Sequence, residues 1–284
     1  MKKIDYLCYF IVILTLITAL VGIFYSTGGS RFVVQNIYGE IIELYGDGIY
    51  KYNSVLKAGG NKGTDLMTLI VAIVFAFFTA LSKSSAKYKF WQAGALAGLL
   101  YYSSCLAFGV TFNRLFPIYV LLFSSCLFAM IFLINGLIKE DNLPQSLKDK
   151  SLKGTAIFLM VSGSSVLVWL EFILPAVITG QPLSIIEIYT TEPTFVLDLA
   201  IILPTYLGCG IALLKKKTIG YKLTPVLLTF ITIIGFTVIG QNVFQTSMGI
   251  DIPIRELIGL VISFVVLGII ATILNAKFMK YIIK

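Results

Sequence analysis

Histidine is absent from this sequence, and charged residues are scarce. Only 13% of the 284 residues are Asp, Glu, Lys or Arg, whereas a soluble domain carries about 25%. Without histidine, the chain lacks a common haem and zinc ligand and the commonest general base. Its four cysteines, Cys8, Cys105, Cys126 and Cys209, form no Cys-x-x-Cys pair, so neither a redox motif nor a zinc site is indicated. We therefore expect no cofactor, and the sequence leaves a bound metal open.

Long apolar segments dominate what is present. Hydrophobic residues make up 58% of the chain. A helix needs roughly 20 apolar residues to cross a hydrocarbon layer of ~30 Å, and its backbone groups must be hydrogen-bonded within the span. The sequence predicts an all-α, polytopic integral membrane protein in a lipid bilayer, with about eight transmembrane helices. The predicted spans are 6–25, 66–82, 91–112, 115–138, 154–175, 196–214, 223–243 and 257–276.

Lysines gather in alternate segments between these spans. If Lys2 and Lys3 are cytoplasmic, sixteen of the 22 basic residues fall on that side, as the positive-inside rule expects. We therefore predict a multi-pass protein of the cell membrane with both termini in the cytoplasm. The same pattern accounts for the net charge of +8 without a nucleic-acid partner. The basic residues left outside are Arg31, Lys51, Lys57, Lys62, Arg114 and Arg255.

Carboxylates are biased to the opposite side. The predicted topology places ten of the 14 acidic residues outside the cytoplasm. The positive-inside rule makes little demand on acids, so this bias is a separate observation. Most of these acids are expected on a solvated outer surface. Those on the outer side are Glu40, Glu43, Asp47, Asp65, Glu171, Glu187, Glu192, Asp198, Asp251 and Glu256.

Two parts of the chain share a pattern. The interval from Asp65 to Tyr88 has the same length as the interval from Asp198 to Tyr221, and each includes a lysine-containing loop. This pattern predicts a parallel repeat of four helices plus four, as some transporters have. The expected domains are residues 1–138, a cytoplasmic linker 139–153 and residues 154–284.

The first outer segment, residues 26–65, is expected to form a small extracytoplasmic cap. Residues 32–34 and 41–45 are rich in β-branched and aromatic side chains and resemble short strands. Gly46-Asp47-Gly48 indicates a turn, and Gly59 to Gly63 is expected to return the chain to the membrane. The segment is either a lid over a site or an inert cover.

Three acids are expected at one depth, near the outer edge of the hydrocarbon. At ~1.5 Å per helical residue, Asp65, Glu171 and Asp198 each lie roughly 25–27 Å from an inner lysine. Ionisable groups at such depth commonly face a cavity or a partner. The alternative is that Asp65 and Asp198 cap helix N-termini, which explains Glu171 poorly. The candidate solute- or ion-binding residues are Glu171, Asp198, Asp65, Arg114, Asn242 and Gln241.

Pro204 lies inside the sixth predicted span, with Gly208 and Gly210 after it. A proline within a helix removes a hydrogen bond and bends the helix. Bent or broken helices often border a transport path. Pro204 is therefore either a gating kink or a static packing kink.

The segment Tyr45-Gly46-Asp47-Gly48-Ile49-Tyr50-Lys51-Tyr52-Asn53-Ser54, followed by Gly63-Thr64-Asp65, resembles a family of bacterial multi-pass membrane proteins of unassigned function. The resemblance covers mainly the first third of the chain, with weaker similarity near Asp198. It implies a multi-pass membrane protein and no particular activity.

Three functions fit these patterns. The first is a transporter of a small solute or cation with an outward-facing acidic site. The second is a non-catalytic membrane partner or assembly subunit. The third is an enzyme acting on an outer-leaflet lipid or lipid-linked substrate, which the absence of a nucleophile motif, metal motif or phosphate loop disfavours. The sequence leaves the solute and the oligomeric state open.

Overall fold

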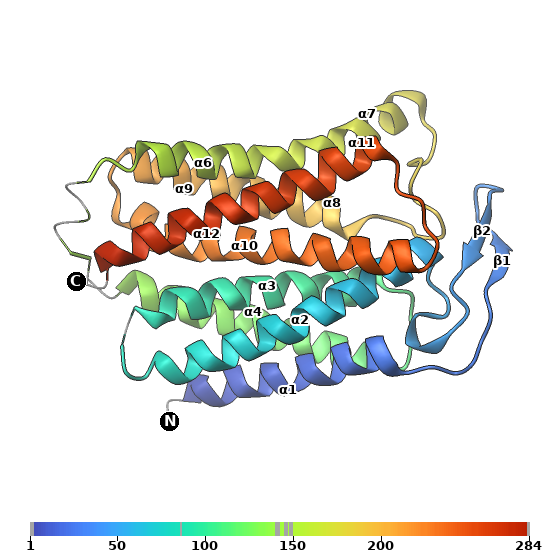
Figure 1. The fold of residues 1–284 in the computed structure, drawn as a ribbon, viewed down its shortest axis with the longest axis horizontal. Coiled ribbons are helices and arrows are strands. Elements are labelled where there is room, and N and C mark those ends of the chain that lie inside the picture. The colour runs from blue at the N-terminus through green and yellow to red at the C-terminus, as the bar shows by residue number, and fades with distance from the viewer. Residues whose placement is uncertain (1–2, 86, 140–142, 145–146, 148–149, 283–284) are drawn as a thin grey trace.

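The computed structural model describes residues 3–85, 87–139, 143–144, 147 and 150–282 of the chain. Its long helices run side by side, and α1 begins at the end of the molecule where α12 finishes (Figure 1). The first group comprises α1 (Lys3–Phe24), α2 (Val55–Leu81), α3 (Tyr88–Gly109) and α4 (Phe116–Lys139). The second comprises α6 (Lys153–Ser164), η2 (Ser165–Trp169), α7 (Leu170–Thr179), α8 (Pro193–Leu197), η3 (Asp198–Ile202), α9 (Leu203–Leu214), α10 (Thr218–Ser247), α11 (Ile254–Glu256), η4 (Leu257–Ile262) and α12 (Ser263–Ile282).

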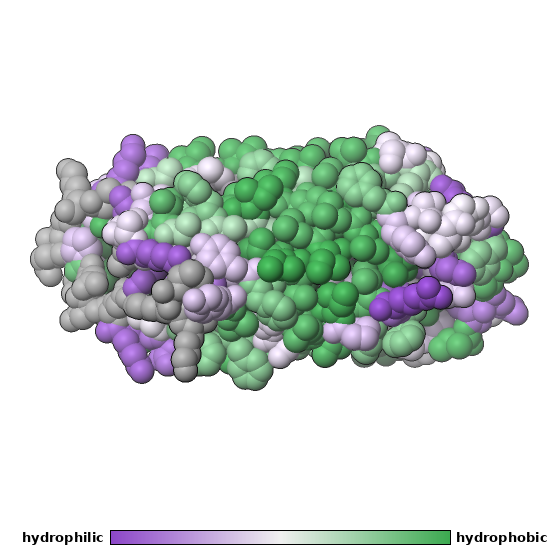
Figure 2. All heavy atoms as spheres, turned by 90° about the horizontal axis from the view of Figure 1, so that it is seen from below, coloured by the Kyte–Doolittle hydropathy of each residue, from purple (hydrophilic) through white to green (hydrophobic). Residues whose placement is uncertain are grey.

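The predicted all-α class is confirmed. Seven of the described helical segments are long and apolar enough to cross a membrane, which suggests a multi-pass membrane protein. On the face that Figure 2 shows, apolar side chains cover the middle of the molecule and polar side chains lie toward both ends. α3 begins before the predicted span 91–112, ends at Gly109 within it and is not among the seven. The number of spans therefore stays a prediction.

Some residues used in the topology prediction lie outside the described residues. They include part of the predicted linker 139–153. The charged residues concerned are Lys2, Glu140, Asp141, Lys148, Asp149 and Lys284.

Two clusters of buried apolar side chains form most of the core. The first cluster is formed by side chains of α1, α2, α3 and α4 and includes Leu99 and Leu122. The second joins α6, α9, α10 and α12 and includes Leu159 and Leu228. α10 connects the two groups, because it packs on α2 and α3 as well as on α9 and α12. The proposed parallel repeat itself stays a prediction.

Glycines let α10 approach its neighbours closely. A Cβ added to Gly63 of α2 would lie 2.2 Å from the carbonyl oxygen of Gly240, so the two helices cross in backbone contact. A Cβ added to Gly94 of α3 would lie 2.4 Å from the Cβ of Thr229. The small residues of segment 94–98 therefore pack against α10, as small residues do between membrane helices.

α2 begins earlier than predicted. Ser54 is its N-cap and accepts a hydrogen bond from the backbone N–H of Lys57 at 3.3 Å. The segment from Gly59 to Gly63, expected to be a loop, is helical. Glycine has a low intrinsic helix propensity, but here the missing side chains permit the contact with α10. Interhelical packing therefore overrides the local preference.

The hairpin segment, residues 25–54, contains the two expected strands. β1 (Phe32–Gln35) pairs antiparallel with β2 (Ile41–Leu44), with Phe32 opposite Leu44. The hairpin lies at the end of the molecule opposite the two termini (Figure 1). Burial disfavours the charged form of Asp47, but hydrogen bonds from the backbone and side chain of Thr27, from Ser26 and from Gly29 hold the pKa of Asp47 well below its ordinary value.

Several of the helices are irregular where they near the hairpin end. η2 is a 3-10 segment between α6 and α7, and η3, Asp198–Ile202, is π-helical. Pro204 follows η3 within the continuous helical segment Pro193–Leu214, where it removes one backbone hydrogen bond. π-helical turns are frequent at functional sites. The gating role assigned to Pro204 stays a prediction.

The crossing of α2 and α10 is directly testable. Gly63→Ala should destabilise the protein by on the order of 1–3 kcal/mol, because the new methyl group overlaps the backbone of Gly240. Gly208→Ala is the matched control, since no atom lies within 4 Å of a Cβ added there. Thermal unfolding in detergent measures both. Equal melting temperatures for the two variants would refute the close crossing.

Candidate functional site

Asp65 is buried in the interior of α2. It has 0% relative exposure, and both carboxylate oxygens accept hydrogen bonds. The hydroxyl of Tyr50 donates to Oδ2 at 2.7 Å, and the hydroxyl of Tyr102 donates to Oδ1 at 2.7 Å. Because Ser54 caps α2, Asp65 does not cap a helix N-terminus. The capping alternative is therefore wrong for this residue.

α1 forms the wall beside this carboxylate. A Cβ added to Gly22 would lie 1.9 Å from Oδ2 of Asp65 and 2.9 Å from the hydroxyl oxygen of Tyr50. Only glycine leaves room for the carboxylate at this point. The hydroxyl of Tyr102 also lies 3.4 Å from Oγ1 of Thr18 on α1, which gives the tyrosine a second hydrogen-bond partner.

Asp198 has a comparable environment in the second group of helices. It is 6% exposed and lies where α8 passes into η3. The indole N–H of Trp169 donates to Oδ2 at 2.7 Å, and the hydroxyl of Tyr101 donates to Oδ1 at 3.0 Å. The N-cap of α8 is Glu192. Capping is therefore wrong for Asp198 as well.

Two consecutive tyrosines of α3 donate hydrogen bonds to the two carboxylates. Tyr102 donates to Asp65 in the first group of helices, and Tyr101 donates to Asp198 in the second. Each carboxylate thus accepts from two uncharged donors. Among the described residues, neither has an ion pair within 4.0 Å. Burying a carboxylate is costly. The charge of buried Lys62, whose Nζ donates to the carbonyl oxygen of Ile23 at 2.9 Å, acts favourably on Asp65 from beyond 4.0 Å.

A polar cluster joins the start of α2 to the loop before α8. Lys57 Nζ lies 2.5 Å from a carboxylate oxygen of Glu192. The hydroxyl of Ser54 donates to Glu187 at 2.5 Å, and the hydroxyl of Tyr189 donates to Asn53 at 3.1 Å. These contacts hold residues 187–192 against the hairpin segment.

The pKa of Glu187 is raised above its ordinary value. Burial is the main cause, and the nearby carboxylate of Glu192 adds to it. The hydrogen bond from Ser54 and the charge of Lys57 act in the opposite direction without cancelling the effect. The folded protein therefore holds a proton on Glu187 more tightly than the unfolded chain does.

The other predicted site residues are not brought to these carboxylates. Glu171 is about half exposed and pairs with exposed Arg255, and Arg114 is exposed in the turn before α4. Gln241 of α10 donates to the hydroxyl of Thr64 at 2.8 Å, next to Asp65 in the chain. Asn242 follows on α10 and is half-buried. A binding role for these residues stays a prediction.

The donors to the two acids were missed by sequence reasoning. Tyr101 and Tyr102 are two hydroxyl-bearing aromatics side by side in an apolar segment, which was the available signal. Tyr50 lies in the hairpin segment, outside the predicted spans, so nothing in the sequence indicated that it would contact a buried acid. Within the described part of the chain, no group of three or more His, Cys, Asp or Glu side chains could hold a metal ion.

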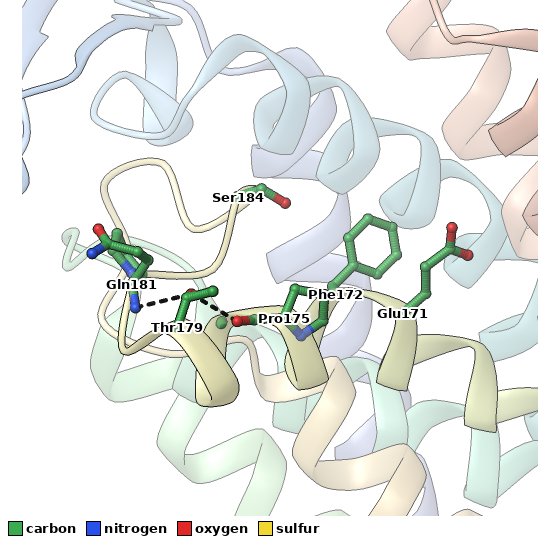
Figure 3. A pocket seen from close by; sticks show the side chains of 8 residues that line it. Glu171, Phe172, Pro175, Thr179, Gln181 and Ser184 are labelled. Atoms are coloured by element: carbon green, nitrogen blue, oxygen red, sulfur yellow. Dashed lines mark hydrogen bonds between the residues drawn. The ribbon is translucent and has the colours of Figure 1, made fainter.

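A groove lies at the hairpin end of the second group. It has a volume of about 210 Å³. Figure 3 shows Glu171 and Phe172 extending from α7, with Ser184 on the facing loop. The lining residues are Glu171, Phe172, Pro175, Ala176, Thr179, Gln181, Pro182 and Ser184.

The chain matches no protein-family model, no curated protein and no solved structure. The functional argument therefore rests on the geometry of the site.

The bonds to Asp65 should be measurable. Tyr102→Phe removes one of the two donors and should cost about 1–3 kcal/mol of stability, because a buried oxygen then lacks a partner. In an Asp65→Leu background the same change should cost less. Tyr6→Phe, at a side chain 63% exposed, is the control. Thermal unfolding of the four variants measures the coupling between Tyr102 and Asp65, and additive effects would contradict the bond.

The raised pKa of Glu187 predicts that the stability of the fold depends on pH. Because its pKa is raised in the folded state, the associated stability is present below the ordinary value of 4.5 and is lost as the pH rises through the folded pKa. Glu187→Gln keeps an oxygen that accepts from Ser54 and removes the charge. The variant should gain stability relative to the wild type as the pH rises above the ordinary value of 4.5 and through the folded pKa. A constant difference in melting temperature would count against this assignment.

Proposed function

We propose that this protein transports a small solute or cation across the membrane, and that Asp65 and Asp198 bind protons or the cation during the cycle. The observation that carries the proposal is the pair of buried carboxylates, each bonded by two uncharged aromatic donors. Ionisable groups within membrane spans are rare and commonly belong to ion or proton pathways.

Asp65 has the features of a site that changes protonation. When it is charged, Tyr50 and Tyr102 each donate to one of its oxygens. When it is protonated, one oxygen becomes a donor, and the hydroxyl of Tyr102 can turn toward Thr18, 3.4 Å away. Protonation would therefore rearrange contacts among α1, α2 and α3. Such a rearrangement is what a coupled transporter requires, since binding must favour one conformation over another.

Asp198 is placed to take part in the same cycle through α3. Tyr101 and Tyr102 are consecutive residues, so a rotation of α3 that weakens one hydrogen bond also changes the other. The π-helical η3 begins at Asp198, and Pro204 follows it. This irregular helix is a suitable place for a hinge.

We infer the orientation from charge. The lysine-rich end, with both termini, faces the cytoplasm, and the hairpin segment faces outward. The two groups of four helices then form the halves of a parallel repeat. The contacts of Lys57 with Glu192 and of Ser54 with Glu187 cover the outer end, and they would have to loosen for a solute to reach Asp198.

Transport through these acids is testable in liposomes. The purified protein should pass protons when an acidic pH is imposed on the hairpin side, or should move Na⁺, K⁺ or an ammonium compound in exchange. A trapped pH-sensitive dye and isotope uptake measure these fluxes. Asp65→Asn and Asp198→Asn should each reduce flux to that of empty liposomes, because an amide cannot bind a proton or carry the charge.

Glu43→Gln is the matched control. Glu43 is an exposed carboxylate of the hairpin segment, paired with Arg31, and its substitution should leave flux unchanged. Folding of each variant is checked by size-exclusion chromatography and thermal unfolding. If folded Asp65→Asn and Asp198→Asn proteins transport as well as the wild type, the proposed function is wrong.

A further inference from the structure

The polar cluster at the hairpin end connects the first group of helices with the chain that leads into Asp198. Lys57 of α2 contacts Glu192, the N-cap of α8, with Nζ 2.5 Å from a carboxylate oxygen. α8 then runs directly into Asp198 at the start of η3, so a movement of Glu192 is transmitted toward the buried carboxylate. The cluster comprises Asn53, Ser54, Lys57, Glu187, Tyr189 and Glu192.

Three hydrogen bonds hold the loop of this cluster, residues 183–192, against the hairpin segment. Ser54 donates to the side chain of Glu187 at 2.5 Å, and Asn36 donates to the backbone carbonyl oxygen of Glu187 at 2.8 Å. The hydroxyl of Tyr189 donates to Asn53 at 3.1 Å. Each bond joins the loop to the hairpin segment, so the loop cannot move away from that segment without losing all three.

The backbone of Glu187 is strained in this closed arrangement. Its φ angle is 50°, in the left-handed region that favours glycine and is uncommon for other residues. Such strain persists only where surrounding contacts maintain it, and it is frequent in switch regions. Here the bonds from Ser54 and Asn36 act on Glu187 itself. If they are lost, relief of the strain favours movement of the loop.

Protonation of Glu187 favours the closed arrangement. Burial raises the pKa of Glu187 above the ordinary value of 4.5, the charge of Glu192 adds to this, and the charge of Lys57 only partly opposes it. A loop that moves into solvent would restore the ordinary pKa, so loss of the proton favours the open arrangement. The charged and titratable groups around Glu187 are Lys57 of α2, Glu40, which shares Asn36 with it, and Tyr189 and Glu192 of its own loop.

We propose that the polar cluster is a pH-sensitive outer gate, which is closed while Glu187 is protonated and opens when Glu187 is ionised. Opening moves residues 183–192 away from the hairpin segment and gives outside water access to Asp198. An acidic medium outside would otherwise drive protons through the buried acids, and the gate limits that flow. This inference rests on the proposed function, because the gate controls access to one of its two carboxylates.

Hydrogen exchange followed by mass spectrometry measures the gate without transport. Wild type and Glu187→Gln are compared in nanodiscs at the same pH, so that their intrinsic exchange rates match. Below the ordinary pKa of 4.5, residues 183–192 should be equally protected in both. Above it, opening of the wild type should increase relative to the variant by up to about tenfold per pH unit, because one proton is released. The difference should become constant above the folded pKa of Glu187.

Two further substitutions test the same loop. Lys57→Gln should increase exchange of residues 183–192 at every pH, because Glu192 then lacks its charged partner. Glu43→Gln is the matched control. It makes the same change at an exposed carboxylate of the hairpin segment that pairs with Arg31, and exchange of residues 183–192 should equal that of the wild type.

Transport gives a second readout. With an equal pH difference across the liposome membrane, flux through the wild type should increase as the pH on the hairpin side is raised. Flux through Glu187→Gln should stay at the level that the wild type has at low pH, because the amide keeps the gate closed. Thermal unfolding checks that the variant is folded.

The outcomes separate the gate from the proposed function. Equal protection of residues 183–192 in wild type and Glu187→Gln at every pH would overturn the gate, as would a flux of Glu187→Gln that follows the wild type. If flux still depended on Asp65 and Asp198 in those cases, the proposed function would stand. If protection depends on Glu187 as expected but no flux depends on Asp65 or Asp198, the pH-dependent closure is supported and transport is not.

Discussion

A carboxylate inside an apolar helix bundle needs hydrogen-bond donors, and this requirement determines how the helices around Asp65 and Asp198 are arranged. Asp65 and Asp198 obtain those donors from aromatic side chains rather than from cations. α3 supplies one donor to each, so it must lie between α2 and the junction of α8 with η3. A buried oxygen without a donor would cost about 1–3 kcal/mol. The position of α3 is therefore strongly constrained.

Close helix packing meets this constraint. Gly22 on α1 leaves space for the carboxylate of Asp65, and Gly63 and Gly240 allow α2 to contact α10 directly. α10 then packs on α3 through Gly94. Each of these contacts depends on the absence of a side chain. The helices that surround Asp65 thus also fix how the first group of helices packs on the second.

The sequence predicted the all-α class, because long apolar segments are a local signal. Isolated carboxylates made Asp65, Asp198 and Glu171 candidates, with helix capping as the alternative for the first two. It did not predict where α2 begins, because the glycines before Asp65 resemble a loop unless the packing of α10 is known. Glu171 was expected at the same depth as Asp198. The structure leaves Glu171 about half exposed, because α7 contributes no buried residue to the bundle. Residue counts estimate how far along a helix a residue lies. They do not show whether its side chain faces the bundle or the outside.

The sequence by itself determined that this chain is helical, that it is apolar enough to enter a membrane and that few of its carboxylates lie among apolar residues. These properties follow from composition and from the spacing of residues along the chain. The tertiary structure alone decided which acids are buried, that Tyr50, Tyr101, Tyr102 and Trp169 donate hydrogen bonds to them, and that Glu171 pairs with Arg255 beside a groove. Those pairings join residues far apart in sequence, and they depend on helix rotation and close packing that no local pattern specifies.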